Sequence, residues 1–279
     1  HRVYFMRYPP LPSLVALPFY QIAGPSAQSA CLSLNVFLAV YLASMIWIGR
    51  LWGGRRGGVL MGLAAAAVPH VSVWCRTYVP DVALLAAVAL SMGALVGCSG
   101  LTRRRETWLL GASLAMGMLA RWTFPWFMGL PFLVVVIQTC IDEPRERRTI
   151  VTLLTHLALT AAVIALGAME SVGSAPAGPL RDPHAAIRFA VLSACWLYWL
   201  TLARRLRPED DDPGAIRPWA GLALALSTAV LGTLWWYAFA AGTIYEKLLM
   251  DASEHQRTGG LFLQNLAEYV AALSHTLPG

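Results

Sequence analysis

The amino-acid sequence predicts an all-α protein, a polytopic transmembrane bundle of about eight spans with an interfacial helix near the N-terminus. Hydrophobic residues make up 57% of its 279 residues and charged residues only 13%, whereas a soluble domain is about half apolar and a quarter charged. The apolar residues fall into long runs, and about 20 of them are needed to cross a bilayer. Arginine-rich loops between these runs alternate with arginine-poor ones, which is typical of membrane topology signals.

The first apolar stretch, residues 10–23, is too short and too rich in proline to span a membrane. We interpret it as a helix that lies in the membrane interface, with Phe19 and Tyr20 at the depth of the lipid head groups. Gly24-Pro25-Ser26 then breaks the helix and turns the chain into the bilayer.

Eight longer apolar segments follow, and each is predicted to be a transmembrane helix. They are residues 28–49, 57–75, 80–98, 107–121, 123–140, 150–170, 185–203 and 219–241. The fourth and fifth are separated only by Arg121-Trp122-Thr123, and the fifth contains Pro125 and Pro131.

Every second loop between these spans is rich in arginine, and the positive-inside rule places all four such loops in the cytoplasm. These arginines are Arg50, Arg55 and Arg56, then Arg103, Arg104 and Arg105, then Arg145, Arg147 and Arg148, and last Arg204, Arg205 and Arg207. The remaining segments, residues 1–26, 76–81, 121–123, 171–184 and the tail from 242, then lie outside. We therefore expect a multi-pass protein of the cell (inner) membrane with an extracytoplasmic active face.

The net charge of +6 does not indicate nucleic-acid binding, because the arginines cluster at the ends of spans. The five cysteines have neither the spacing of a metal site nor that of a disulfide framework. Residues 1–242 are predicted to form one transmembrane domain, and residues 243–279 an outer segment or the start of a further region. The chain begins at His1 in what resembles the middle of a loop, so we expect at least one helix upstream.

The outer turn before the third span holds the densest cluster of ionisable groups. Asp81 follows Pro80 at the predicted start of a helix, where the positive end of the helix dipole favours a carboxylate. Arg76, five residues earlier, is expected either to pair with Asp81 as a structural salt bridge or to hold a ligand phosphate.

Two further outer arginines are candidates for binding an anion. Arg7 and Tyr8 precede the rigid Pro9-Pro10 turn, and Arg121 lies between two spans. Each arginine also has a structural interpretation, as a contact with lipid head groups for Arg7 and as an interfacial anchor for Arg121. The sequence contains no zinc spacing, phosphate-binding glycine loop or nucleophile elbow.

The order of these motifs resembles a known family, the GT-C glycosyltransferases of the dolichyl-phosphate-mannose protein mannosyltransferase and aminoarabinose transferase type. The resemblance covers residues 7 to about 135 well and rests on four motifs. They are Arg7-Tyr8-Pro9-Pro10-Leu11-Pro12, Gly24-Pro25-Ser26, Arg76-Thr77-Tyr78-Val79-Pro80-Asp81 and Leu119-Ala120-Arg121-Trp122-Thr123.

The resemblance implies transfer of a sugar from a polyprenyl-phosphate carrier to a lipid, glycan or protein acceptor outside the cytoplasm. Asp81 matches the acidic position of the family's second outer loop and would be catalytic. Arg7, Tyr8, Arg76 and Arg121 would contact the substrate phosphate. No cofactor is implied, although a divalent metal is optional in such enzymes.

Two departures from the family pattern affect this assignment. Tyr8 stands where members often have Lys or His before Pro-Pro, so Arg7 would supply the charge. The family's principal catalytic acid lies in the first outer loop, yet no Asp or Glu precedes Asp81 in this chain, so that acid is expected upstream. The alternatives are a permease or transport subunit and a catalytically inactive membrane scaffold, although no inverted repeat supports the permease.

Overall fold

The computed structural model describes residues 9–76, 78–142, 144, 147–170, 183–205 and 215–237. Over these ranges the chain is all-α, without a β-strand, and one isolated bridge joins Arg103 to Ala215. The helices are α1 (Leu11–Ala23), α2 (Ala27–Ala66), α3 (Pro69–Arg76), α4 (Asp81–Gly97), α5 (Arg104–Ala120), α6 (Phe124–Asp142), α7 (Arg147–Glu170), α8 (Pro183–Arg205) and a last helix, Pro218–Tyr237.

The predicted membrane bundle is confirmed. Five of the described helices are long and apolar enough to cross a membrane: α2, α6, and the segments Arg147–Leu166, Ala186–Arg204 and Pro218–Tyr237. The predicted span 57–75 differs, because it is broken between the end of α2 and the start of α3. Pro69, the first residue of α3, lacks an amide hydrogen and disfavours helical geometry in the preceding residue, which explains the break.

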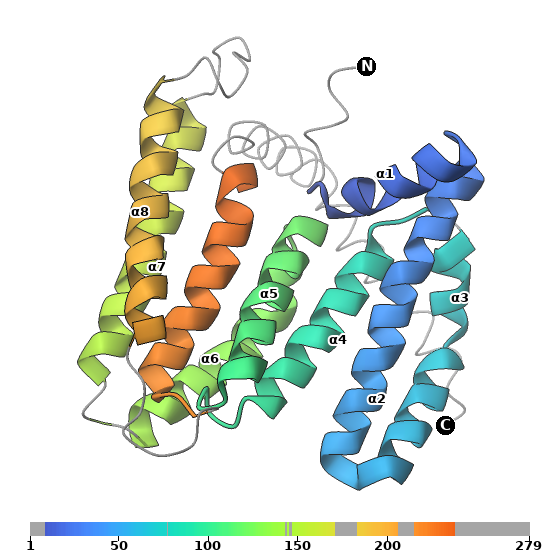
Figure 1. Cartoon of the computed structure of the whole chain (residues 1–279), viewed down its shortest axis with the longest axis horizontal. Coiled ribbons are helices and arrows are strands. Elements are labelled where there is room, and N and C mark those ends of the chain that lie inside the picture. The colour runs from blue at the N-terminus through green and yellow to red at the C-terminus, as the bar shows by residue number, and fades with distance from the viewer. Residues whose placement is uncertain are drawn as a thin grey trace, which may run out of the picture.

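α2 contains the predicted span 28–49 and the first part of the span 57–75, because the chain reverses direction within it (Figure 1). The reversal occurs at Gly53 and Gly54, and the φ of +60° at Gly54 favours glycine. The two limbs pack so closely that a Cβ on Gly49 would overlap the backbone oxygen of Gly57. The limbs therefore form a tight helical hairpin.

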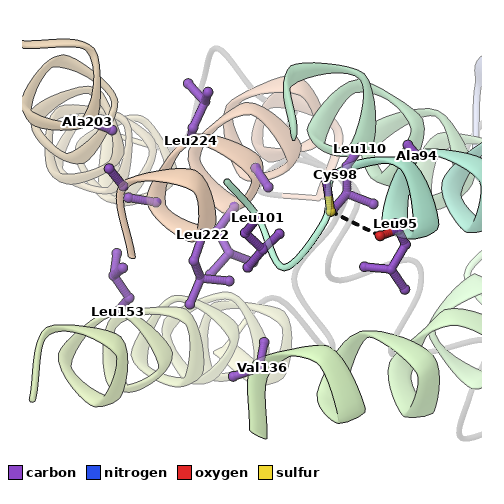
Figure 2. Close-up of a cluster of buried hydrophobic side chains, with 14 of the residues drawn as sticks. Ala94, Leu95, Cys98, Leu101, Leu110, Val136, Leu153, Ala203, Leu222 and Leu224 are labelled. Carbon is purple, nitrogen blue, oxygen red and sulfur yellow. Dashed lines mark hydrogen bonds between the residues drawn. The ribbon is translucent and has the colours of Figure 1, made fainter. Parts of the chain in front are cut away.

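The core lies where α4 and α5 meet the last helix. Figure 2 shows Leu101, Leu110 and Leu222 in this cluster, and all three side chains are fully buried. The amide of Ile216 donates to the carbonyl of Thr102 over 2.8 Å, which ties the α4–α5 turn to the last helix.

The bundle has two different ends. In Figure 1 the reversal of α2, the α4–α5 turn, the start of α7 and the end of α8 lie at the lower end, and these are the arginine-rich positions. α1 lies across the opposite, upper end, and it packs against α2 and α5. The structure therefore gathers the arginine-rich segments at one end, as the charge pattern predicts.

Candidate functional site

An ion pair joins two helix ends at the α1 end of the bundle. Asp81 is the first residue of α4, and Arg121 is the residue that caps the C-terminus of α5. The guanidinium of Arg121 contacts the carboxylate of Asp81 through Nη1 and Oδ1. The side chain of Arg121 is 31% exposed and that of Asp81 is 34% exposed, so a ligand can reach both groups.

The turn between α5 and α6 holds Arg121 in place. Arg121 has an extended backbone, its amide donates to the carbonyl of Gly117 over 3.0 Å, and its carbonyl accepts from the amide of Phe124 over 3.1 Å. Phe124 is buried, and its ring lies so close to Gly117 that a Cβ at that glycine would overlap it. The path of the chain through Arg121 is therefore fixed on both sides.

Asp81 lies in an environment that stabilises negative charge. The N-terminus of α4 presents unpaired amides and the positive end of the helix dipole, and Arg121 adds a formal charge. Because the pair is about one-third exposed, it contributes no more than about 1 kcal/mol to stability. The arrangement can hold a proton acceptor beside a cation without locking either group away from a substrate.

A shallow cleft of about 570 Å³ opens between the start of α2 and the end of α3. Its lining residues are Ala27, Gln28, Cys31, Leu32, Asn35, Leu38 and Arg76. The thiol of Cys31 donates to the carbonyl of Arg76 over 3.4 Å, so the two helices meet at the wall of this cleft. The cleft combines one cation and two amides with an apolar surface.

Tyr78 lies in the connection between α3 and α4, beside α1. Partial burial raises the pKa of Tyr78, and an interaction with the hydroxyl of Ser13 offsets part of this rise. Ser13 belongs to α1. α1 is thus in contact with the turn that leads to Asp81.

The structure brings together some of the residues that the sequence singles out. Asp81 pairs with Arg121, and Arg76 lines the cleft. Of the two roles that the sequence analysis gave Arg76, pairing with Asp81 is therefore not seen, and holding a ligand phosphate stays a prediction. Arg7 and Tyr8 lie outside the described residues.

Sequence reasoning missed Gln28 and Asn35, although a signal was present. They are amides seven residues apart in an apolar run, which is two turns of a helix and therefore one face. Within the described ranges, no group of three or more His, Cys, Asp or Glu side chains is placed to hold a metal ion.

Comparison with known families gives one finding. The family model for dolichyl-phosphate-mannose-protein mannosyltransferase matches residues 7–169, more than half of the chain. The matched stretch includes Arg76, Asp81 and Arg121, and also the cleft residues of α2 and α3. No curated protein and no solved structure gives a significant match.

Proposed function

Because the chain belongs to the dolichyl-phosphate-mannose-protein mannosyltransferase family, a family of membrane glycosyltransferases of the GT-C type, we propose that it moves a sugar from a polyprenyl-phosphate carrier to an acceptor. The acceptor is a lipid, a glycan or a protein with a free hydroxyl or amine. The reaction takes place on the extracytoplasmic face of the membrane.

The proposed chemistry needs a base and a cation close together. The acceptor oxygen or nitrogen attacks the anomeric carbon of the sugar, the bond from that carbon to the carrier phosphate breaks, and the phosphate leaves with the bonding electrons. The carboxylate of Asp81 takes the proton from the acceptor. Arg121 stabilises the charge that develops on the leaving phosphate, and Arg76 is a further phosphate partner.

The observation that supports this proposal is the contact between Asp81 and Arg121. The carboxylate and the guanidinium touch, and both are partly exposed. Together they place a base for the acceptor and a positive charge for the phosphate at one point. Their position at the helix ends also suits a donor whose sugar lies outside the bilayer while its chain remains in lipid.

The proposed face follows from the arginine distribution. The arginine-rich ends of the helices lie opposite the α1 end (Figure 1), and arginine-rich loops remain in the cytoplasm. The Asp81–Arg121 pair would therefore face the other side. A polyprenyl chain would reach it along the lipid-exposed helices.

The full-length protein in proteoliposomes tests this function. Radiolabelled decaprenyl-phosphate sugars serve as donors, with lipid, glycan and peptide acceptors supplied separately. We expect Asp81→Asn to lower the rate of transfer about 100-fold or more, because the base is lost. Asp142→Asn is the matched control, because Asp142 is the last residue of α6, at the end away from the Arg121 turn. This variant should transfer sugar at the wild-type rate.

Two results would contradict the proposal. Wild-type rates for Asp81→Asn would remove the assigned base. Solute flux through the proteoliposomes with no sugar transfer from any donor would instead favour a permease.

A further inference from the structure

The last helix packs closely against α5. Both helices run from the arginine-rich end of the bundle to the α1 end (Figure 1). A Cβ on Gly111 of α5 would lie 2.7 Å from the carbonyl oxygen of Ala225. Further along, a Cβ on Gly232 would lie 2.9 Å from the Cβ of Ala115. The end of the last helix is therefore held beside the last turns of α5.

A hydrogen bond joins the ends of these two helices. Tyr237, the last residue of the last helix, donates its hydroxyl hydrogen to the carbonyl oxygen of Met118 over 2.8 Å. Met118 belongs to the last turn of α5, shortly before Arg121, and it lies 119 positions from Tyr237 in the sequence. The bond thus connects the last helix to the turn that carries Arg121.

The carbonyl of Met118 needs a donor from outside its own helix. In a continuing α-helix it would accept from the amide of Trp122, four residues further on. α5 ends at Ala120, however, and Arg121 has an extended backbone, so the helical pattern stops there. The last carbonyls of a helix have no intrahelical donor, and a buried carbonyl without one is destabilising. The hydroxyl of Tyr237 supplies the donor.

The neighbouring carbonyl shows how this bond affects Arg121. Gly117 directly precedes Met118, and its carbonyl accepts from the amide of Arg121 over 3.0 Å. The last turn of α5 therefore has one bond to the Arg121 backbone and one bond to the last helix. A displacement of this turn would move the Arg121 backbone, and the guanidinium with it, relative to Asp81.

We propose that Tyr237 is a positioning residue for Arg121. Its hydroxyl holds the last turn of α5 and thereby keeps the guanidinium of Arg121 where the donor phosphate binds. In this role Tyr237 acts through Arg121 and not on the donor itself. The inference rests on the proposed transfer reaction, in which Arg121 faces the leaving phosphate. It extends the site beyond residues 7–169, the stretch that the family model matches, to the last helix.

Backbone hydrogen–deuterium exchange of the full-length protein tests the tether directly. The exchange of residues 117–126 is measured by mass spectrometry in dodecyl maltoside micelles. Tyr237→Phe removes the hydroxyl and keeps the ring. We expect this variant to exchange about three- to tenfold faster in that stretch, because it has lost one hydrogen bond that resists local opening.

Steady-state sugar transfer in proteoliposomes tests the consequence for Arg121. In Tyr237→Phe the donor KM should rise about three- to tenfold. The acceptor KM should stay at the wild-type value, because Arg121 faces the donor phosphate and not the acceptor. A smaller folded fraction would instead lower kcat and leave both KM values unchanged. The two KM values therefore separate positioning from a general loss of structure.

Matched variants isolate the hydroxyl as a hydrogen-bond donor. Tyr237→p-aminophenylalanine restores a donor at the same place on the ring, so both the exchange and the donor KM should return close to wild type. Thr233→Val removes a hydroxyl one turn earlier, whose bonds run to the carbonyls of Ala229 and Val230 in the same helix. It should leave both values unchanged. If Tyr237→Phe does not fold, Tyr237→p-methylphenylalanine gives the same test, because its methyl group fills the space without donating.

Three results would overturn the inference. These are wild-type exchange of residues 117–126 in Tyr237→Phe, an equal rise of the donor and acceptor KM values, and no rescue by p-aminophenylalanine. A wild-type protein that transfers no sugar from any donor would instead refute the proposed function, and the exchange rates alone would then decide whether Tyr237 holds the Arg121 turn. Sugar transfer by the wild type together with unchanged exchange in Tyr237→Phe would refute only the role of Tyr237.

Discussion

Phe124, the first residue of α6, packs its ring against Gly117 of α5 with no room for a Cβ between them. The two residues flank the turn that carries Arg121, and backbone hydrogen bonds join Arg121 to both. The glycine is therefore required for a close approach and not for an unusual backbone angle. It allows α6 to begin directly after α5 with Arg121 beside Asp81.

Gly117→Ala is expected to displace Phe124 and with it the Arg121 turn. Overpacking of this kind costs about 1–3 kcal/mol, so thermal unfolding of the purified protein should shift to lower temperature. The donor KM should rise as well, because Arg121 moves away from the substrate phosphate.

Two glycines serve as controls for this prediction. Gly129→Ala in α6 places a methyl group in open space. It should leave both the unfolding temperature and the donor KM unchanged. Gly111→Ala in the same helix α5 would meet the carbonyl oxygen of Ala225 at 2.7 Å, so it should lower stability without a selective effect on KM. If the Gly117 and Gly111 variants changed the donor KM equally, Gly117 would have no positioning role for Arg121.

The Asp81–Arg121 pair should matter more for activity than for stability. A double-mutant cycle with Asp81→Asn and Arg121→Gln should give a coupling free energy of unfolding below about 1 kcal/mol, because the pair is about one-third exposed. Each single variant should nevertheless lower transfer about 100-fold or more. A coupling of several kcal/mol, with only slight loss of transfer, would make the pair a structural bridge.

The sequence predicts the helices well, because long apolar runs carry a strong signal. Over the described residues, each predicted span except the broken 57–75 coincides with helix, and the boundaries of α4 and α6 agree within two residues. The break before Pro69 was missed, because an apolar count does not register a single proline. The interfacial segment 10–23 corresponds to α1, although its depth in a membrane stays a prediction.

The partner of Asp81 was harder to predict. Arg76 is near in sequence, whereas Arg121 is 40 residues away, and spacing favours the nearer residue. The topology contains the missing information: α4 and α5 are neighbouring antiparallel helices joined by a short turn, so the start of one lies beside the end of the other. The direction in which a side chain points at a helix end can, however, be known only from the structure.

The hairpin of α2 gives a stability prediction that is independent of the site. Gly49→Ala would bring a methyl group within 2.7 Å of the Met61 Cβ and into the backbone of Gly57, and we expect a loss of about 1–3 kcal/mol. Gly53→Ala, at the reversal, meets nothing within 4 Å and is the matched control. Equal thermal midpoints for the two variants would show that the limbs are not in such close contact.

Tyr78 should make stability depend on alkaline pH. Its pKa is raised above the ordinary value of 10.0, with burial the largest cause, so the folded protein holds this proton more tightly than the unfolded chain does. The resulting stabilisation is complete below about pH 10 and is lost as the pH rises through the folded pKa. Tyr78→Phe has no proton to lose, so its thermal midpoint should fall less between pH 9 and pH 11 than that of the wild type. Tyr198→Phe, on the exposed surface of α8, should follow the wild type, and parallel curves for all three proteins would refute a specific role for Tyr78.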